Sequence, residues 1–328
     1  MEYRTLGKTG FEIAAISLGT WQVGGKWGSA FDAQSASKIL HAAIDEGINF
    51  IDTADVYEAG QSEKAVGQVL KERSERIYVA TKCGRQLKPH TSEAYTPAAL
   101  RGFVEASLKN MGLETLDLIQ LHCPPTAVYY RPEIFELFDR LKEEGKIQHL
   151  GVSVEKVEEA IKAMEFPNVA SVQIIFNLFR QRPAELFFQL AKQKNVGIIV
   201  RVPLASGLLT GQFHQHTVFE KGDHRFFNRE GAAFDKGETF SGIPYETGLA
   251  AVEALKKIFP DLDNLAPIAL QWILGFPEVS CIIPGASRME QVHSNLSALN
   301  LPKLSPEQLT QMNEIYTQYI KSTVHHLW

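Results

Sequence analysis

The sequence contains little cysteine and no long apolar run. Its three cysteines, Cys83, Cys123 and Cys281, are an odd number without Cys-x-x-Cys spacing, which argues against a disulfide framework. No apolar run approaches the roughly 20 residues that a helix needs to cross a bilayer. The opening residues, Met1 to Gly7, also lack the apolar stretch of a signal peptide. We therefore expect a protein of the reducing cytoplasm with no membrane partner.

An excess of positive charge is also absent. The formal net charge is −5 and the sequence pI is about 6.1, whereas general nucleic-acid-binding proteins usually carry a basic excess, so we expect no nucleic-acid partner. With 45% apolar and 22% charged residues, the chain has an ordinary globular composition. It contains no Pro/Ser-rich linker and no low-complexity tract. We expect residues 1–328 to form one domain, whose oligomeric state the sequence leaves open.

Short β-rich runs alternate with amphipathic helical stretches along the chain. The helix ending at Gly145 shows the pattern well, with Ile134, Leu137, Phe138 and Leu141 on one face. The predicted strands are 14–18, 49–52, 78–82, 116–122, 149–153, 171–177, 197–202 and 280–283. Eight strands with helical crossovers predict a (β/α)₈ TIM barrel of the α/β class.

Two features refine this fold prediction. The competing interpretation is an open, doubly wound sheet, but no G-x-G-x-x-G motif follows the first strand to support it. Residues 3–5 and 12–13, joined by the turn sequence Leu6-Gly7-Lys8-Thr9-Gly10, predict an N-terminal β-hairpin. We expect this hairpin to cap the bottom of the barrel.

Four polar residues stand at or just after the ends of predicted strands two, three and four. Asp52 and Lys82 end two apolar runs, His122 ends a third, and Tyr57 follows Asp52 by five residues. Any one of them alone has an ordinary structural explanation, such as a turn cap, a solvated end or a buried imidazole. Together they would converge at the carboxyl ends of neighbouring parallel strands, where α/β barrels place their chemistry.

The segments that carry these residues resemble the aldo-keto reductase family. Asn49-Phe50-Ile51-Asp52-Thr53-Ala54-Asp55-Val56-Tyr57 is similar to its second-strand signature, Val79-Ala80-Thr81-Lys82 to its third and Asp117-Leu118-Ile119-Gln120-Leu121-His122 to its fourth. The resemblance runs from the hairpin to about residue 299. It implies a catalytic tetrad of Asp52, Tyr57, Lys82 and His122 with a small-molecule carbonyl substrate.

The chemistry of these groups fits the implied roles. Free tyrosine titrates near pH ~10, which is too high for an efficient acid at neutral pH. We expect a Lys82 ammonium, held against Asp52, to lower that value. Tyr57 would then protonate the carbonyl oxygen as general acid while His122 orients it.

Small residues follow strands seven and eight, where barrels often bind phosphate. Such residues let backbone N–H groups approach an anion, although ordinary Gly/Ser turns would look the same. The resemblance implies that they bind NADP(H), with Arg288 pairing with the 2′-phosphate and favouring NADPH over NADH. The expected cofactor-binding residues are Thr20, Trp21, Asp52, Ser153, Gln173, Arg201, Pro203, Leu204, Ser206, Gly207, Leu208, Gly211, Arg225, Gly285, Ser287, Arg288, Gln291 and Asn295, with Asn177 a further candidate.

Two segments depart from the simple pattern. Arg201 stands where many members of the family carry an aromatic residue against the nicotinamide ring. A guanidinium is planar and can also stack, but it brings a fixed positive charge. The connection 208–245 is long for a compact domain, and it is either a lid with Arg225 on the cofactor pyrophosphate or a solvated excursion.

Aromatic residues after strands one and four are candidates for a substrate pocket, although they could instead pack those loops. Trp21 is the strongest of them, and the others are Trp27, Phe31, Tyr129 and Tyr130. The histidines at 214, 216, 325 and 326 lack companion ligands at zinc-site spacing, so we predict no metal site.

The sequence thus predicts an NADPH-dependent oxidoreductase that reduces aldehydes or ketones. One alternative is an NADP-binding regulatory or sensor subunit of the same fold with slow turnover, because some relatives act as channel subunits. Another is a lyase that uses Lys82 as a Schiff-base nucleophile.

Overall fold

The computed structural model describes residues 1–25 and 30–328. Among these residues, one eight-stranded sheet runs in the order β10-β9-β8-β7-β6-β5-β4-β3, with every neighbouring pair parallel. Its strands are β3 (Leu18–Gly19), β4 (Phe50–Asp52), β5 (Tyr78–Cys83), β6 (Leu116–His122), β7 (Ile147–Ser153), β8 (Val169–Ile175), β9 (Gly197–Arg201) and β10 (Val279–Ile282). The predicted (β/α)₈ barrel is confirmed.

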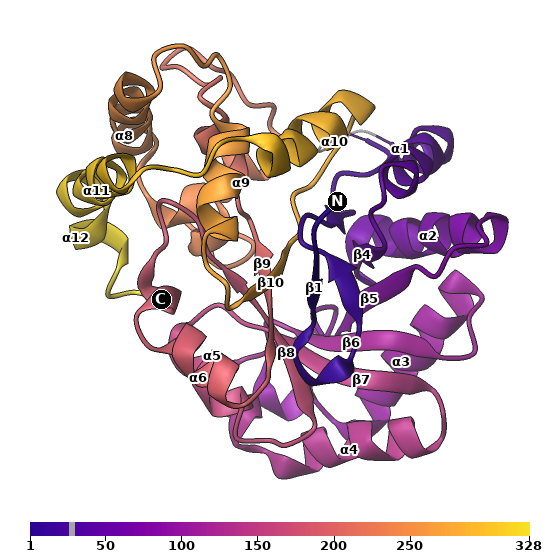
Figure 1. The fold of residues 1–328 in the computed structure, drawn as a ribbon. Coiled ribbons are helices and arrows are strands. Elements are labelled where there is room, and N and C mark those ends of the chain that lie inside the picture. Colours follow the sequence, from indigo (N-terminus) through magenta and orange to yellow (C-terminus); the bar gives the residue numbers. More distant parts are fainter. Residues whose placement is uncertain (26–29) are drawn as a thin grey trace.

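Helices surround the sheet (Figure 1). They are α1 (Ala33–Asp45), α2 (Gln61–Glu72), α3 (Pro97–Met111), α4 (Pro132–Glu143), α5 (Val157–Ala163), α6 (Phe187–Gln193), α7 (His224–Phe227), α8 (Tyr245–Ile258), α9 (Ala266–Leu274), α10 (Met289–Leu296), α11 (Pro306–Ile315) and α12 (Lys321–Val324). None of those in the described ranges is long and apolar enough to cross a membrane.

Sequence signals explain the helix boundaries. In α3, the Thr96 side chain accepts a hydrogen bond from Ala99 N, Pro97 occupies the first turn, and Gly112 ends the helix with a φ of 64°. The apolar faces of the helices that follow the barrel strands, such as α1, α3 and α4, belong to one large core with the strands. The helices thus cover the sides of the barrel, and the loops surround the carboxyl ends of its strands.

The first barrel strand is shorter than predicted. The prediction was 14–18, but Ala14 ends the hairpin and the strand itself is Leu18–Gly19. Ser17 donates its hydroxyl to Ala14 O over 2.7 Å and so bends the chain between the two. Isolated parallel bridges from Ile16 to Ile282 and from Gly19 to Gly285 then bring this segment beside β10, which closes the sheet.

The predicted N-terminal hairpin is present. Strands β1 (Tyr3–Thr5) and β2 (Glu12–Ala14) pair antiparallel. The hairpin side chains Leu6, Phe11 and Ile13 pack with Phe50, Ala80, Leu118 and Ile199 from the strands. Lys8 N donates to Asn195 O, just before β9 begins, over 2.8 Å. The hairpin therefore caps the amino-terminal end of the barrel, opposite the predicted site.

The connection between β9 and α8 contains short helical segments. They are α7 and three 3₁₀ turns, Ala205–Thr210, Lys236–Glu238 and Phe240–Gly242. Strand β8 also ends at Ile175, two residues before the predicted end, because Asn177 turns its side chain to Val202 O over 2.9 Å.

The N-terminal hairpin, which plugs the end of the barrel opposite the site, should contribute to stability without contributing to the site. Leu6 is fully buried, and Leu6→Ala would leave a cavity, so we expect a loss of about 2–5 kcal/mol in the free energy of unfolding. Urea denaturation followed by circular dichroism measures it. The control is Val218→Ala, at a side chain that is 89% exposed, where we expect a change below about 0.5 kcal/mol. Equal effects of both variants would contradict a plug role.

Candidate active site

Lys82 lies at the centre of the carboxyl-terminal end of the barrel. Its ammonium is 1% exposed and forms a salt bridge with Asp52 Oδ1. It also donates to Thr53 O over 2.8 Å and to Tyr57 Oη over 3.2 Å. A buried ammonium has three N–H donors, and here each has an acceptor. Three of the four predicted tetrad residues thus form one connected group.

Two glutamines complete the surroundings of Asp52. Its Oδ2 atom accepts from Gln120 Nε2 over 3.0 Å and from Gln173 Nε2 over 2.8 Å. Gln173 also donates to Gln120 Oε1 over 3.1 Å. These residues lie on β4, β6 and β8, so their side chains meet inside the barrel. The carboxylate is therefore fixed in position and hydrogen-bonded on both oxygens.

A strained turn presents Tyr57 to this group. The two residues that follow it, Glu58 and Ala59, have φ values of 46° and 51°. Non-glycine residues rarely adopt this left-handed conformation, and it is held only where the surroundings enforce it. The turn ends at Gly60, from which α2 starts. It directs the partly buried phenol back toward Lys82.

The pKa of the Tyr57 phenol differs from the expectation. Burial raises this pKa, and the Lys82 ammonium lowers it by less, so the phenol titrates above its ordinary value. Lys82 thus acts in the expected direction, but the expectation of a lowered phenol pKa was wrong, because desolvation is the larger effect. At Lys82 itself burial lowers the pKa, but Asp52 and Tyr57 outweigh it and hold the pKa above its ordinary value. The group consists of a protonated phenol beside an ammonium.

His122 contributes a neutral imidazole. Burial first, and then the positive charges of Arg85, Lys82 and Arg201, hold its pKa well below the ordinary value. Its ring lies 6.1 Å from that of Tyr57, centroid to centroid, and nearly perpendicular to it. Nδ1 is buried and has no hydrogen-bond partner among the described residues.

A cavity of about 380 Å³ opens over the tetrad. Three tetrad residues, Asp52, Tyr57 and His122, are in its wall, while Lys82 lies beneath them. The remaining lining comes from Gln173 on β8, from the ends of β3 and β9, from the loops after β3, β9 and β10, and from the long connection. Those residues are Gly19, Thr20, Trp21, Gln22, Gln173, Arg201, Val202, Pro203, Leu204, Ser206, Gly207, Thr210, Gln212, Phe213, His224, Arg225, Glu238, Ile283, Pro284, Gly285, Arg288 and Gln291.

Most of the residues predicted to bind a cofactor lie in this wall. The exceptions are Ser153, Leu208, Gly211, Ser287 and Asn295. Ser287 stays close, since its backbone N donates to the lining residue Gln291 over 2.7 Å, whereas Asn177 is engaged with Val202 O and Ser241 Oγ.

The wall suits an anionic, nucleotide-like group at one end. Ser206 and Gly207 have φ values of 56° and 97° in a turn that a hydrogen bond from Gly207 N to Leu204 O closes over 2.9 Å, and the small residues there let an anion approach the backbone. Arg288 is exposed, and no hydrogen bond or ion pair engages its guanidinium within residues 1–25 and 30–328. Arg225 instead pairs with Asp223 over 2.6 Å. Arg288 is thus the available cation of the two.

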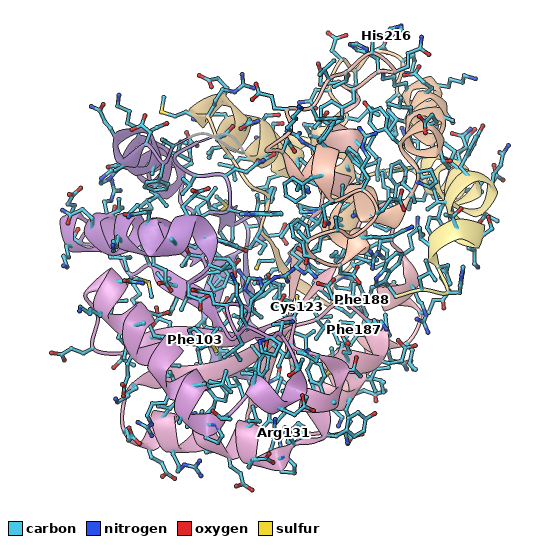
Figure 2. All side chains as sticks on the ribbon, turned by 180° about the vertical axis from the view of Figure 1, so that it is seen from behind. Phe103, Cys123, Arg131, Phe187, Phe188 and His216 are labelled. Atoms are coloured by element: carbon cyan, nitrogen blue, oxygen red, sulfur yellow. The ribbon has the colours of Figure 1, made fainter. Side chains whose placement is uncertain are left out.

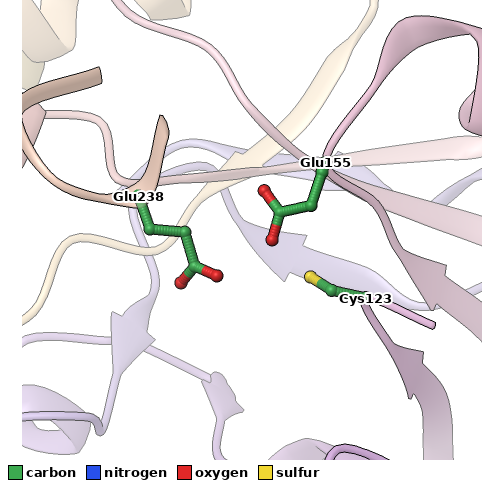
Figure 3. A group of neighbouring side chains, drawn as sticks. All are labelled: Cys123, Glu155 and Glu238. Carbon is green, nitrogen blue, oxygen red and sulfur yellow. The ribbon is translucent and has the colours of Figure 1, made fainter. Parts of the chain in front are cut away.

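A second charged group extends from the cavity wall, to which it contributes Arg201 and Glu238 (Figure 3). Cys123, Glu155 and Glu238 place one ligand atom each within 4.8 Å of one another, the kind of set that can hold a metal ion. The Arg201 guanidinium already contacts all three, at 2.8 Å from Glu155 Oε2, 3.4 Å from Glu238 Oε2 and 3.5 Å from Cys123 Sγ. Arg85 adds a contact of 2.8 Å to Glu238. The group therefore suits a guanidinium rather than a metal ion.

The two carboxyl groups in this cluster, Glu155 and Glu238, differ in the direction of their pKa shift. Burial and the neighbouring Glu238 hold the pKa of the Glu155 carboxyl above its ordinary value. At Glu238 burial is outweighed by Arg85 and Arg201, which hold its pKa below the ordinary range. Glu238 is therefore the carboxylate that balances the guanidinium groups at the cavity.

Sequence reasoning missed the contribution of the long connection to the wall. Phe213, His224 and Glu238 line the cavity, whereas Leu208, Gly211 and Arg225 were the residues predicted from this segment, and of those Arg225 is in the wall. The available signal was the length and aromatic content of the connection. No periodicity marks which of its residues turn inward.

The aromatic residues that were predicted to line a substrate pocket differ in where they lie. Trp21 lines the cavity, with its ring 6.2 Å from that of Tyr57. Tyr129 is fully buried and Tyr130 is 66% exposed, and neither of them nor Phe31 is part of the lining. Trp27 lies outside the described residues. His216 lies at the edge of the molecule, far from Cys123 (Figure 2).

Comparisons with known proteins agree on one family. A model described as "Aldo/keto reductase family" matches residues 15–317. Aldo-keto reductase YhdN of Bacillus subtilis is 30% identical over 99% of this chain and 96% of its own. A putative voltage-gated potassium channel subunit beta of Schizosaccharomyces pombe is 32% identical over 95% of this chain and 92% of its own. Among solved structures, the glycerol dehydrogenase AKR11B4 from Gluconobacter oxydans has a TM-score of 0.79 and 28% identity, covering 97% and 96% of the two chains.

The buried neutral His122 predicts a pH dependence of stability. Below the ordinary histidine pKa of about 6.5, His122 is protonated in the unfolded chain but stays neutral in the folded protein. The free energy of unfolding therefore falls as the pH falls. Below pH ~6.5, the free energy of unfolding of the wild type should therefore fall by up to about 1.4 kcal/mol per pH unit relative to that of His122→Gln. Above pH ~7.5 the difference between the two proteins should not change with pH. Urea unfolding of both proteins from pH 5 to 8 measures the difference. A difference independent of pH would contradict a neutral imidazole.

Proposed function

Because the chain belongs to the aldo/keto reductase family, we propose that it reduces aldehyde or ketone carbonyls to alcohols with NADPH. The observation that carries the proposal is the Tyr57 hydroxyl held 3.2 Å from the buried Lys82 ammonium at the wall of the cavity. Carbonyl reduction needs a proton donor where negative charge develops on oxygen, and this arrangement supplies one.

The roles of the residues follow from their contacts. A bound nicotinamide cofactor would supply the hydride for the carbonyl carbon. Tyr57 is placed to give its phenolic proton to the carbonyl oxygen. Lys82 stabilises the phenolate that remains, while Asp52 keeps the ammonium in place. His122, neutral and beside Tyr57, orients the substrate oxygen by a hydrogen bond.

The contacts of Lys82 argue against the lyase alternative. A Schiff-base nucleophile must be a neutral amine with a free lone pair. Lys82 instead carries a pKa above its ordinary value and donates to three acceptors. A charged lysine in this setting acts through its field and not as a nucleophile.

The regulatory alternative has support from one relative described as a "Putative voltage-gated potassium channel subunit beta", from Schizosaccharomyces pombe. Multiple-turnover kinetics with a panel of aldehydes and ketones separate the two, with NADPH absorbance as the signal. A reductase consumes NADPH in step with the alcohol formed. A sensor subunit binds the nucleotide but does not turn over at a metabolically useful rate.

Tyr57→Phe keeps the ring and removes the proton donor. We expect carbonyl reduction to fall by about 10²–10⁴-fold while NADPH affinity stays near the wild-type value. Steady-state kinetics and fluorescence titration of NADPH measure the two effects. The control is Tyr130→Phe, which alters a 66% exposed ring outside the cavity and should behave as wild type. Retention of most of the turnover in Tyr57→Phe would reject Tyr57 as the acid.

Arg288→Ala tests the choice of nucleotide. If Arg288 binds the 2′-phosphate, its loss should weaken NADPH binding by about 1.5–3 kcal/mol and leave NADH binding nearly unchanged. Calorimetric titration with each nucleotide measures this, and Lys303→Ala, at an exposed lysine outside the lining, is the charge-matched control. Equal losses for the two nucleotides would mean that Arg288 only supports its loop.

A further inference from the structure

The indole of Trp328 is buried against the long connection that follows β9. Its side chain is 6% exposed, and Nε1 donates to Asp235 Oδ1 over 2.9 Å. The guanidinium of Arg180 lies 4.0 Å from the centre of the ring on one side. A tryptophan held by a hydrogen bond, a cation and close packing is a fixed contact and not a surface side chain.

The partner of Trp328 is residues 235–242, which we term the strap. Two strap glycines leave room for the indole. A Cβ added at Gly242 would lie 2.5 Å from the Trp328 ring, and one at Gly237 would lie 2.9 Å from it. Gly242 has a φ of 82°, so a side chain there would be strained as well. The strap therefore fits the indole closely along its length.

The strap also carries Glu238 into the cavity wall. Asp235 Oδ1, which accepts the indole N–H, also accepts a hydrogen bond from Gly237 N over 2.7 Å. This bond caps the turn that ends at Glu238. Glu238 pairs with Arg85 over 2.8 Å and with Arg201 over 3.4 Å. Its backbone oxygen accepts from Ser206 Oγ, in the loop after β9, over 3.0 Å.

The other side of the contact is anchored independently of the strap. Ile320 and Val324, before the indole in the chain, are fully buried in the main core. The Tyr316 hydroxyl and His325 Nδ1 are 2.8 Å apart, and His325 Nε2 lies 3.0 Å from Glu185. The indole is thus presented from a fixed support.

We propose that Trp328 is a positioning residue that latches the strap and thereby holds Glu238 in the wall of the substrate cavity. The proposal rests on the reductase function for its kinetic part. Without the latch, Glu238 would move away from Arg85 and Arg201 and leave Glu155 as their remaining carboxyl partner. The cavity wall would loosen on the side away from the Asp52–Lys82 group, which the strap does not touch.

The test is Trp328→Ala against its neighbour Leu327→Ala, a control at a 42% exposed side chain. In hydrogen exchange without nucleotide, Trp328→Ala should speed exchange of the strap amides by about tenfold or more and leave the β-strands unchanged. In kinetics, KM for the carbonyl substrate should rise by about tenfold and kcat by less than about twofold in either direction. Leu327→Ala should match the wild type in both.

Two more variants separate positioning from general structure. Trp328→Phe retains the ring over Arg180 and loses the N–H donor, so it should restore most of the KM and exchange behaviour. In a Glu238→Gln background, Trp328→Ala should raise KM by less than about twofold, because its effect acts through that carboxylate. The exchange result does not depend on activity, so an inactive wild type would reject the reductase function while still testing the latch.

Three outcomes would overturn the proposal. One is unchanged strap exchange and KM in Trp328→Ala. Another is faster exchange across the whole protein that Trp328→Phe does not reverse, which would make Trp328 a general stability residue. The last is a full additive KM effect of Trp328→Ala in the Glu238→Gln background.

Discussion

The buried ammonium of Lys82 is the constraint on which the active end of the barrel depends. A charge removed from water costs several kcal/mol unless opposite charge and hydrogen bonds compensate for it. Here Asp52 supplies the charge, while Thr53 and Tyr57 supply the remaining acceptors. Asp52 is in turn fixed by Gln120 and Gln173. The polar groups inside the barrel therefore compensate the buried charge of Lys82, and among them Tyr57 lies at the wall of the cavity.

The surroundings of this layer control which groups are charged. Burial keeps His122 neutral and raises the pKa of the Tyr57 phenol. Arg85 and Arg201 lie on the other side of the cavity and would be costly without a counter-charge, which Glu238 provides. An arginine at the end of β9 is thus tolerated because the carboxyl groups of Glu155 and Glu238 lie beside it. The cation that remains available is Arg288, at the exposed end of the cavity.

Several residues that complete the cavity lie far from the tetrad in sequence. The strap reaches back from beyond β9 to Arg85, and the Trp328 indole reaches Asp235 across 93 positions. Such contacts join a loop, a chain segment after the barrel and the strand ends. They explain how a long connection with little regular structure keeps a defined shape over the site.

The sequence by itself determined the barrel, the N-terminal hairpin and the predicted positions of Asp52, Lys82 and His122. Alternating strand and helix patterns are local signals, and parallel strands that end in polar residues must bring those residues to one edge. Only the tertiary structure decided that Glu238 lines the cavity, because loop residues have no periodicity from which their direction follows. It also decided that the pKa of Tyr57 lies above its ordinary value, since a pKa depends on burial as well as on nearby charges. Burial is a property of the assembled barrel, and a motif of a few residues does not contain it.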